Sequence, residues 1–145
     1  MKKRGLETAN RRAVIGLAIG ILALTGPVAA DEFRGKRGTR VNPVNAAVFE
    51  VVARSSTRGP DFWCGAADYA RRALGRGWTD RIYVARSMGP SVTTNRRSAV
   101  HFTLDPGAAG ISPAKPSLSI NAFRVGDSMS IQQANTHCNI PLRGV

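Results

Sequence analysis

The first 30 residues constrain most strongly what this chain can fold into, because they predict how much of it remains to fold and in which compartment. Basic residues at positions 2–4 precede an uncharged, mostly apolar run over residues 13–30, which ends in small side chains before Asp31. A basic start, an apolar run and a small-residue cleavage site are typical of a secretory signal peptide. We therefore expect residues 1–30 to be removed, leaving a periplasmic or secreted protein with no transmembrane segment.

Two other interpretations of this segment remain open. An apolar run of about 18 residues is just long enough to span a bilayer, so an uncleaved membrane anchor is the alternative to a cleaved signal. The pair Arg11-Arg12 ahead of the run is also typical of a twin-arginine signal, which would mean export after folding rather than before it.

The periodicity of the remaining residues predicts a single α+β domain over residues 46–145. Residues 31–45 combine Gly, Pro, Asn and four cations and predict an extended basic lead-in. Residues 62–74 have helical spacing between a cap at Asp61 and a stop at Gly75. Strands are predicted over residues 46–53, 81–86, 98–104, 117–123 and 128–133. This order predicts one main helix packed on a mostly antiparallel sheet of about five strands.

The charge of the predicted mature chain favours an anionic partner. From Asp31 onward there are 16 Lys and Arg, 14 of them Arg, and 8 Asp and Glu, which gives a net charge of +8. Such a surface attracts polyanions, whether a lipid headgroup, a polysaccharide or a nucleic acid. The alternative is that the charge only keeps the protein in solution. Nothing in the composition indicates the oligomeric state.

The segment GPSVTTNRRS, residues 89–98, is the best candidate for direct anion binding. It gathers hydroxyl groups and two adjacent guanidinium groups, which donate hydrogen bonds to phosphate or carboxylate oxygens. The candidate residues are Thr93, Thr94, Arg96, Arg97 and Ser98. The alternative is a polar hairpin turn whose Thr and Asn side chains only satisfy the backbone.

The two cysteines predict a disulfide. Cys64 lies in the first turn of the predicted helix and Cys138 lies near the C-terminus. An exported protein with an even number of cysteines most often pairs them, because its compartment is oxidising. The bridge would fasten the C-terminal segment to the start of the helix.

A free Cys64 would indicate a different function. A thiol in the first turn of a helix has a lowered pKa, because the positive end of the helix dipole stabilises the thiolate. The segments FWCGAADYA around Cys64 and SAVHFTL around His101 resemble the layout of papain-like cell-wall peptidases of the NlpC/P60 and CHAP type. This resemblance implies a peptidase or amidase with Cys64 as nucleophile and His101 as base. Asn121 is the best candidate for the residue that orients the imidazole.

Other chemistries find little support in the sequence. The neighbours His137 and Cys138 do not have the spacing of a zinc site, and there are no paired carboxylates, C-x-x-C motif or glycine-rich phosphate loop. We therefore expect no cofactor and no metal. The segments FWCGAADYA, RIYVAR, GPSVTT and SAVHFTL resemble small uncharacterised exported proteins of alphaproteobacteria, which implies a location but no activity.

Overall fold

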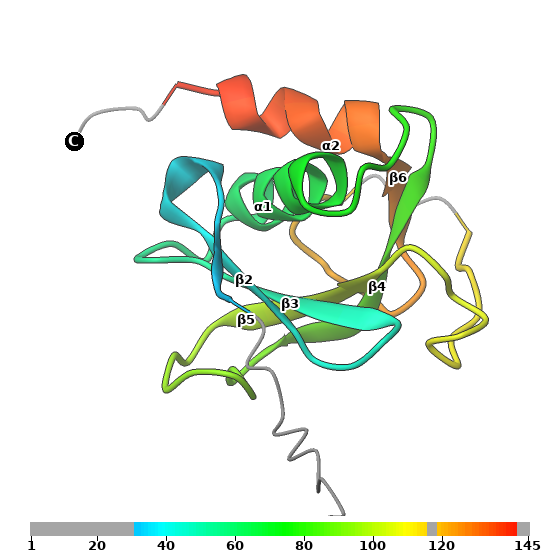
Figure 1. Ribbon diagram of the computed structural model, residues 1–145, viewed down its shortest axis with the longest axis horizontal. Helices are drawn as coiled ribbons and strands as arrows, with labels where there is room; N and C mark the ends of the chain where they lie inside the picture. The colour runs from blue at the N-terminus through cyan, green and yellow to red at the C-terminus, as the bar shows by residue number, and fades with distance from the viewer. Residues whose placement is uncertain (1–30, 116–118, 142–145) are drawn as a thin grey trace, which may run out of the picture.

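Six antiparallel strands form an open sheet with two α-helices on one face, as the computed structural model of the protein shows (Figure 1). The structure describes residues 31–115 and 119–141. The order across the sheet is β1-β2-β3-β5-β4-β6. The strands are β1 Phe33–Arg34, β2 Arg40–Pro43, β3 Val48–Val52, β4 Arg81–Gly89, β5 Ala99–Thr103 and β6 Ser128–Ser130. The helices are α1 Gly59–Arg72 and α2 Ile131–Thr136, with short 3-10 turns η1 Lys36–Gly38 and η2 His137–Asn139.

The paired strands β3 and β5 form the centre of the sheet. Phe49 pairs with Phe102 and Val51 with Val100, and all four side chains are buried in the core beneath α1. Because side chains alternate along a strand, the residues between them lie on the outer face. Glu50 and His101 are directly opposite each other on that outer face, and both are buried. The sheet is therefore covered on both sides at its centre.

Helix α1 packs close to the sheet because its inner face carries small residues. A side-chain carbon added at Gly65 would lie 2.8 Å from both the Thr39 hydroxyl and Val51. Such close packing buries the rings of Trp63, Phe102 and Phe123, whose centroids lie 5.1 to 6.3 Å apart. Aromatic rings at these separations add packing energy beyond the area that they bury.

The start of α1 is fixed by a segment far away in the sequence. The helix begins at Gly59 rather than after Asp61, and the side chain of its N-cap residue Arg58 makes no capping hydrogen bond. Instead, the Gly59 amide donates to Asn121 Oδ1 at 2.7 Å. This contact satisfies one of the amides that a helix start leaves unpaired. Asp61 lies in the first turn of the helix, where its charge is favourable.

The structure confirms an α+β domain and the predicted positions of β3, α1, β4 and β5. It corrects the predicted lead-in over residues 31–45. These residues provide β1 and β2, and Val41 is fully buried, because the edge of β3 offers a hydrogen-bonding partner for β2. The sheet therefore has six strands instead of about five. The predicted signal peptide lies outside the described residues.

Two strands predicted toward the C-terminal end, over residues 117–123 and 128–133, are wrong over described residues. Residues 117 and 118 lie outside the described residues. Residues 119–123 form no strand, and their polar groups are used elsewhere: the Ile120 carbonyl accepts from Trp63 Nε1 at 3.1 Å. The strand predicted over residues 128–133 ends at Ser130 and continues as α2. Ser130 causes this change, because its hydroxyl accepts from the Gln133 amide at 3.1 Å and caps the helix. In the described part of the chain, none of the helices has the length and apolarity that a bilayer crossing requires.

Candidate functional site

The predicted disulfide between Cys64 and Cys138 is present and joins α1 to η2. The Cα atoms of the two residues are 4.9 Å apart and 74 residues separate them in sequence, a distance that lies within the usual range for disulfides. A bridged sulfur cannot act as a nucleophile, because only the free thiolate does so.

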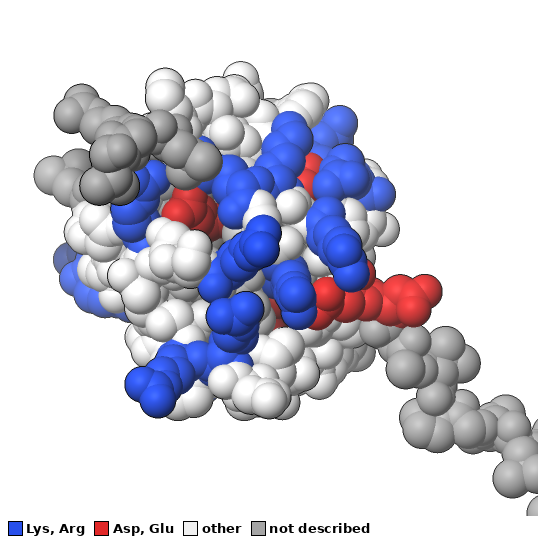
Figure 2. Space-filling view, turned by 90° about the vertical axis from the view of Figure 1, so that its left-hand side faces the viewer, with Lys and Arg blue, Asp and Glu red and all other residues white. Residues whose placement is uncertain are grey.

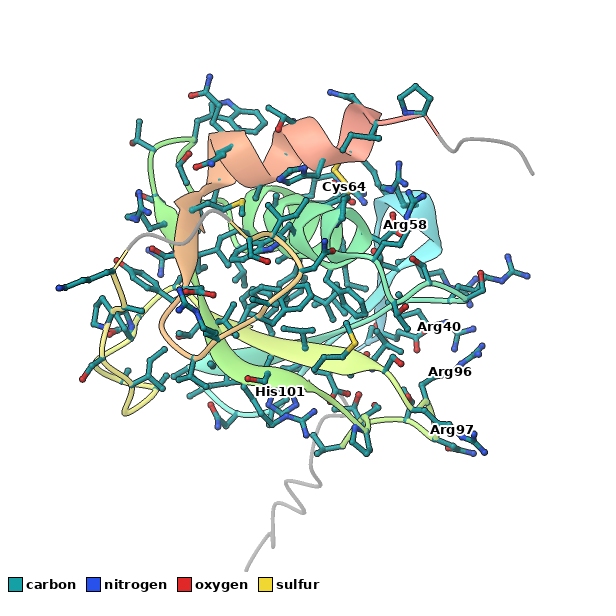
Figure 3. The ribbon with its side chains drawn as sticks, turned by 180° about the vertical axis from the view of Figure 1, so that it is seen from behind. Arg40, Arg58, Cys64, Arg96, Arg97 and His101 are labelled. Carbon is teal, nitrogen blue, oxygen red and sulfur yellow. A yellow bond between two sulfur atoms is a disulfide. The ribbon has the colours of Figure 1, made fainter. Side chains whose placement is uncertain are left out.

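The residues of the alternative catalytic site are not brought together. Figure 3 shows Cys64 at helix α1 and His101 on the other side of the sheet. Asn121 does not orient the imidazole, because its side-chain oxygen accepts from the Gly59 amide at the start of α1. His101 is also buried, since its exposed fraction is only 7%. The arrangement therefore offers no Cys-His site.

The outer face of the sheet holds a row of polar residues that crosses four strands. Asn42 of β2 pairs with Glu50 of β3, Glu50 pairs with His101 of β5, and His101 pairs with Arg86 of β4. His101 Nε2 lies 2.9 Å from Glu50 Oε2, and an Arg86 nitrogen lies 3.5 Å from the same oxygen. Alternation along β2, β3 and β5 places Asn42, Glu50 and His101 on this face. In β4 an irregularity between Val84 and Arg86 brings Arg86 opposite His101.

Residues 90–98, between β4 and β5, contact this row. Ser91 Oγ donates to Glu50 Oε1 at 2.5 Å and Thr93 Oγ1 donates to it at 2.6 Å. The Val92 amide donates to Oε2 at 2.8 Å and the Thr93 amide to Oε1 at 3.2 Å. Glu50 is therefore fully buried with donors on both of its oxygens, and it fastens this loop to the sheet.

These contacts keep the Glu50 carboxylate ionised. Burial alone raises the pKa of Glu50, but the hydrogen bonds from Ser91, Thr93, Val92 and His101 outweigh burial and lower the pKa from 4.5 to about 2. A general base works best with a pKa near the operating pH and needs a free lone pair. Glu50 has neither, so its arrangement suits a structural anchor rather than proton transfer.

His101 completes the anchor as a neutral ring. Burial lowers the pKa of His101 and the positive charge of Arg86 lowers it further, although the hydrogen bond to Glu50 acts in the opposite direction. A carboxylate can only accept hydrogen bonds. We therefore place the imidazole proton on Nε2, where it is donated to Glu50.

The five residues nominated for anion binding divide into two groups. Thr93 turns toward Glu50, and the Thr94 hydroxyl donates to Ser91 Oγ at 2.8 Å. The hydroxyls therefore serve the loop itself, as the turn interpretation expected. Arg96, Arg97 and Ser98 instead line a groove at the surface. The anion that Ser91 and Thr93 bind is therefore the Glu50 carboxylate of the same chain.

This arginine groove, as we call it, lies between residues 53–57 and residues 95–98 and has a volume of about 420 Å³. Its two walls meet because Val52 at the end of β3 pairs with Ala99 at the start of β5. Arg54 stands in one wall and Arg96 and Arg97 in the other. Arg96 links the walls, since its Nη1 donates to the Arg54 carbonyl at 3.1 Å.

The groove belongs to a larger basic face, which we define by five exposed arginines. Figure 3 places Arg40, Arg58, Arg96 and Arg97 along one side of the molecule, and the groove adds Arg54. Figure 2 views this side directly and shows cations gathered in a band across it, with a few acidic side chains beside them. Arg40 pairs with Glu32 at 3.5 Å and Arg58 with Asp61 at 3.9 Å. Within residues 31–115 and 119–141, no carboxylate lies within ion-pair distance of the three groove arginines.

Glu50 and Arg54 were not among the residues predicted from the sequence. A single glutamate within the apolar run of residues 46–53 is a signal that a buried polar network exists, but it does not reveal partners 41 to 51 residues away. Arg54 is a lone cation in a turn. Only the pairing of β3 with β5 brings it beside Arg96.

Among the described residues, no three His, Cys, Asp or Glu side chains are grouped so that they could hold a metal ion.

No family of proteins, curated protein or solved structure matches this chain. The candidate site therefore depends on the geometry of the chain itself.

Proposed function

We propose that this protein is an exported, disulfide-bonded domain that binds an anionic component of the cell envelope through its basic face. The observation that carries this proposal is the absence of carboxylate partners for Arg54, Arg96 and Arg97 among the described residues. Guanidinium groups without an internal counter-charge are available to an external anion, which they bind in a forked geometry.

The distribution of charge favours binding over mere solubility. Some arginines form ion pairs within the fold: Arg72 donates to Asp68 at 2.6 and 2.7 Å across one turn of α1, and Arg37 binds Asp61. The carboxylates of Glu50, Asp61 and Asp68 are all buried. These three carboxylates therefore contribute little negative charge to the surface, and Glu32 beside Arg40 is a partly exposed exception. The positive charge of the groove arginines stays exposed, which creates a positive field outside this part of the protein.

The proposed location has two supports. The segment of residues 1–30 has the composition of a signal peptide, and disulfides persist in oxidising compartments outside the cytoplasm. The domain contains such a bond. An anionic partner in the envelope would then be within reach of the processed protein.

The test uses the processed protein, residues 31–145, and two matrices. At low salt we expect retention on a heparin-like sulfated resin and release as ionic strength rises, because salt screens exposed charges over about 8 Å at physiological concentration. The same resin without sulfate groups is the control. Equal retention on both resins would contradict the proposal. Vesicles of anionic and zwitterionic phospholipid, compared in the same way, show whether a lipid headgroup can serve as the partner.

A further inference from the structure

The arginine groove differs from the rest of the basic face in having two facing walls of donors. Arg54 with the hydroxyl residues 55–57 forms one wall, and Arg96 and Arg97 with Ser98 form the other. None of the residues that line it carries a carboxylate. The groove volume, about 420 Å³, lies within the range of small-molecule sites. These properties fit one charged group held between the walls rather than a flat surface contact.

The chemistry of the donors indicates the class of that group. Each guanidinium offers up to five N–H donors in one plane and each hydroxyl offers one more. A planar carboxylate has two oxygens, whereas a phosphate or sulfate group presents oxygens in several directions. Donors that approach from two opposite walls therefore match a tetrahedral oxyanion better than a carboxylate.

The groove is also held in shape before any ligand arrives. Glu50 receives four hydrogen bonds from residues 91–93, and Ser91 in turn accepts from the Thr94 amide at 2.9 Å. The Thr94 hydroxyl accepts from the Arg96 amide at 3.2 Å, and the Ser91 amide donates to the Arg96 carbonyl at 2.9 Å. A continuous series of contacts thus connects the buried carboxylate with the wall that carries Arg96.

We propose that the arginine groove is a binding site for a phosphate or sulfate group of the anionic partner, and that Glu50 is the positioning residue that holds its loop in the binding shape. The proposal rests on the proposed function and gives it a ligand class. Preorganised donors bind more tightly, because the entropy of ordering them has already been lost during folding.

The first part of the test is a titration of the processed protein with inorganic phosphate, sulfate and acetate at constant ionic strength. Backbone amide resonances report binding. We expect phosphate or sulfate to shift the amides of residues 54–58 and 95–98 in a saturable way, and acetate to shift them much less. Equal shifts with acetate, or shifts spread over the whole surface, would overturn the assigned ligand class.

Substitutions then locate the site. Arg97→Gln should weaken binding of the tetrahedral anion about tenfold or more, because it removes charged hydrogen bonds. Arg76→Gln is the matched control. Arg76 is exposed and belongs to the connection between α1 and β4. Figure 1 shows this connection on the side of the molecule opposite the loop between β4 and β5. Similar losses in both variants would show a non-specific charge effect and would overturn the site.

The direction in which Glu50→Gln changes the affinity for the anion tests the role of Glu50. Glu50→Gln removes a negative charge near the groove, so electrostatics alone predicts tighter anion binding. The positioning role predicts weaker binding, because the amide nitrogen cannot accept from Ser91, Thr93 or Val92. Thr93→Val keeps the charge and removes one anchoring hydroxyl, and it is the variant to use if Glu50→Gln does not fold. We expect it to weaken phosphate binding several-fold, while unchanged binding in a folded variant would contradict the positioning role.

The two proposals can fail separately. Retention on the sulfated resin without saturable shifts in the groove would leave the basic face as the binding surface and overturn the phosphate site. Loss of both the retention and the shifts would overturn the proposed function as well.

Discussion

The hydrogen bonds that stabilise the buried charge of Glu50 also fix the loop between β4 and β5. An ionised carboxylate taken out of water loses several kcal/mol of solvation unless other groups replace it. Here hydroxyls, backbone amides and an imidazole supply that replacement. In return the carboxylate fixes a polar loop that has little apolar surface of its own to bury.

This arrangement makes the stability of the protein depend on pH. The folded pKa of Glu50 is about 2 against 4.5 in the unfolded chain, so its contribution is fully present above pH 4.5 and is lost as pH falls toward 2. The shift corresponds to about 3 kcal/mol at most. The pKa of His101 is also lowered from 6.5, so stability from its neutral form begins to be lost as pH falls below 6.5.

Urea unfolding at a series of pH values measures this dependence. We expect the free energy of unfolding to fall between pH 4.5 and pH 2 and to fall less steeply in Glu50→Gln, which cannot titrate at that position. Other carboxylates change equally in both proteins and therefore cancel in the comparison. An identical slope in the variant would contradict the lowered pKa of Glu50.

At the scale of elements, the sequence predicted those whose hydrophobic pattern is complete within one continuous segment. The helix over residues 59–72 and the strand over residues 99–103 have clear periodicity in a continuous segment. In contrast, β1 and β2 are short, and β2 carries Arg40, Asn42 and Pro43. These residues form a strand because β3 is available beside them, a tertiary cause that no local pattern contains.

The difference between local patterns and long-range contacts also explains how much of the site could be predicted from the sequence. Arg96, Arg97 and Ser98 were nominated because adjacent cations and hydroxyls are visible in one segment, and they do line the groove. Their anchor Glu50 comes from β3, and their partner Arg54 comes from the connection that follows β3. At the C-terminal end, the alternating pattern of residues 128–133 fits a strand as well as a capped helix, and the hydroxyl of Ser130 decides the outcome.

The disulfide gives a prediction about α1 and η2. Cys138→Ser removes a bridge between residues 74 apart and should lower the free energy of unfolding by roughly 2 to 4 kcal/mol, because the bridge restricts the unfolded chain. Retention on sulfated resin should persist under conditions where the variant is folded, since the groove comes from other elements.

A thiol reagent should find no free cysteine in the unaltered protein when it is denatured without reduction. Two reactive thiols without reduction would contradict the bridge.

At the scale of the whole molecule, the fold gathers cations that are scattered in the sequence. Arg40 comes from β2, Arg54 and Arg58 from the connection between β3 and α1, and Arg96 and Arg97 from the loop before β5. All five are exposed. Figure 3 places Arg40, Arg58, Arg96 and Arg97 on one side, and Arg54 lines the groove together with Arg96 and Arg97. The net charge of the chain would be the same if its cations were spread evenly over the surface. The central claim is therefore that the position of these five arginines, and not the total charge, determines anion binding.

Two charge-matched double variants test that claim most directly. One variant combines Arg96→Gln with Arg97→Gln in the groove. The other combines Arg76→Gln with Lys115→Gln, which are exposed and lie outside the basic face. Both lose two positive charges, and the measurement is the salt concentration at which each leaves the sulfated resin. We predict that the groove variant is released at clearly lower salt than the unaltered protein, while the control variant is released close to it. Equal shifts in the two variants would contradict binding through the basic face.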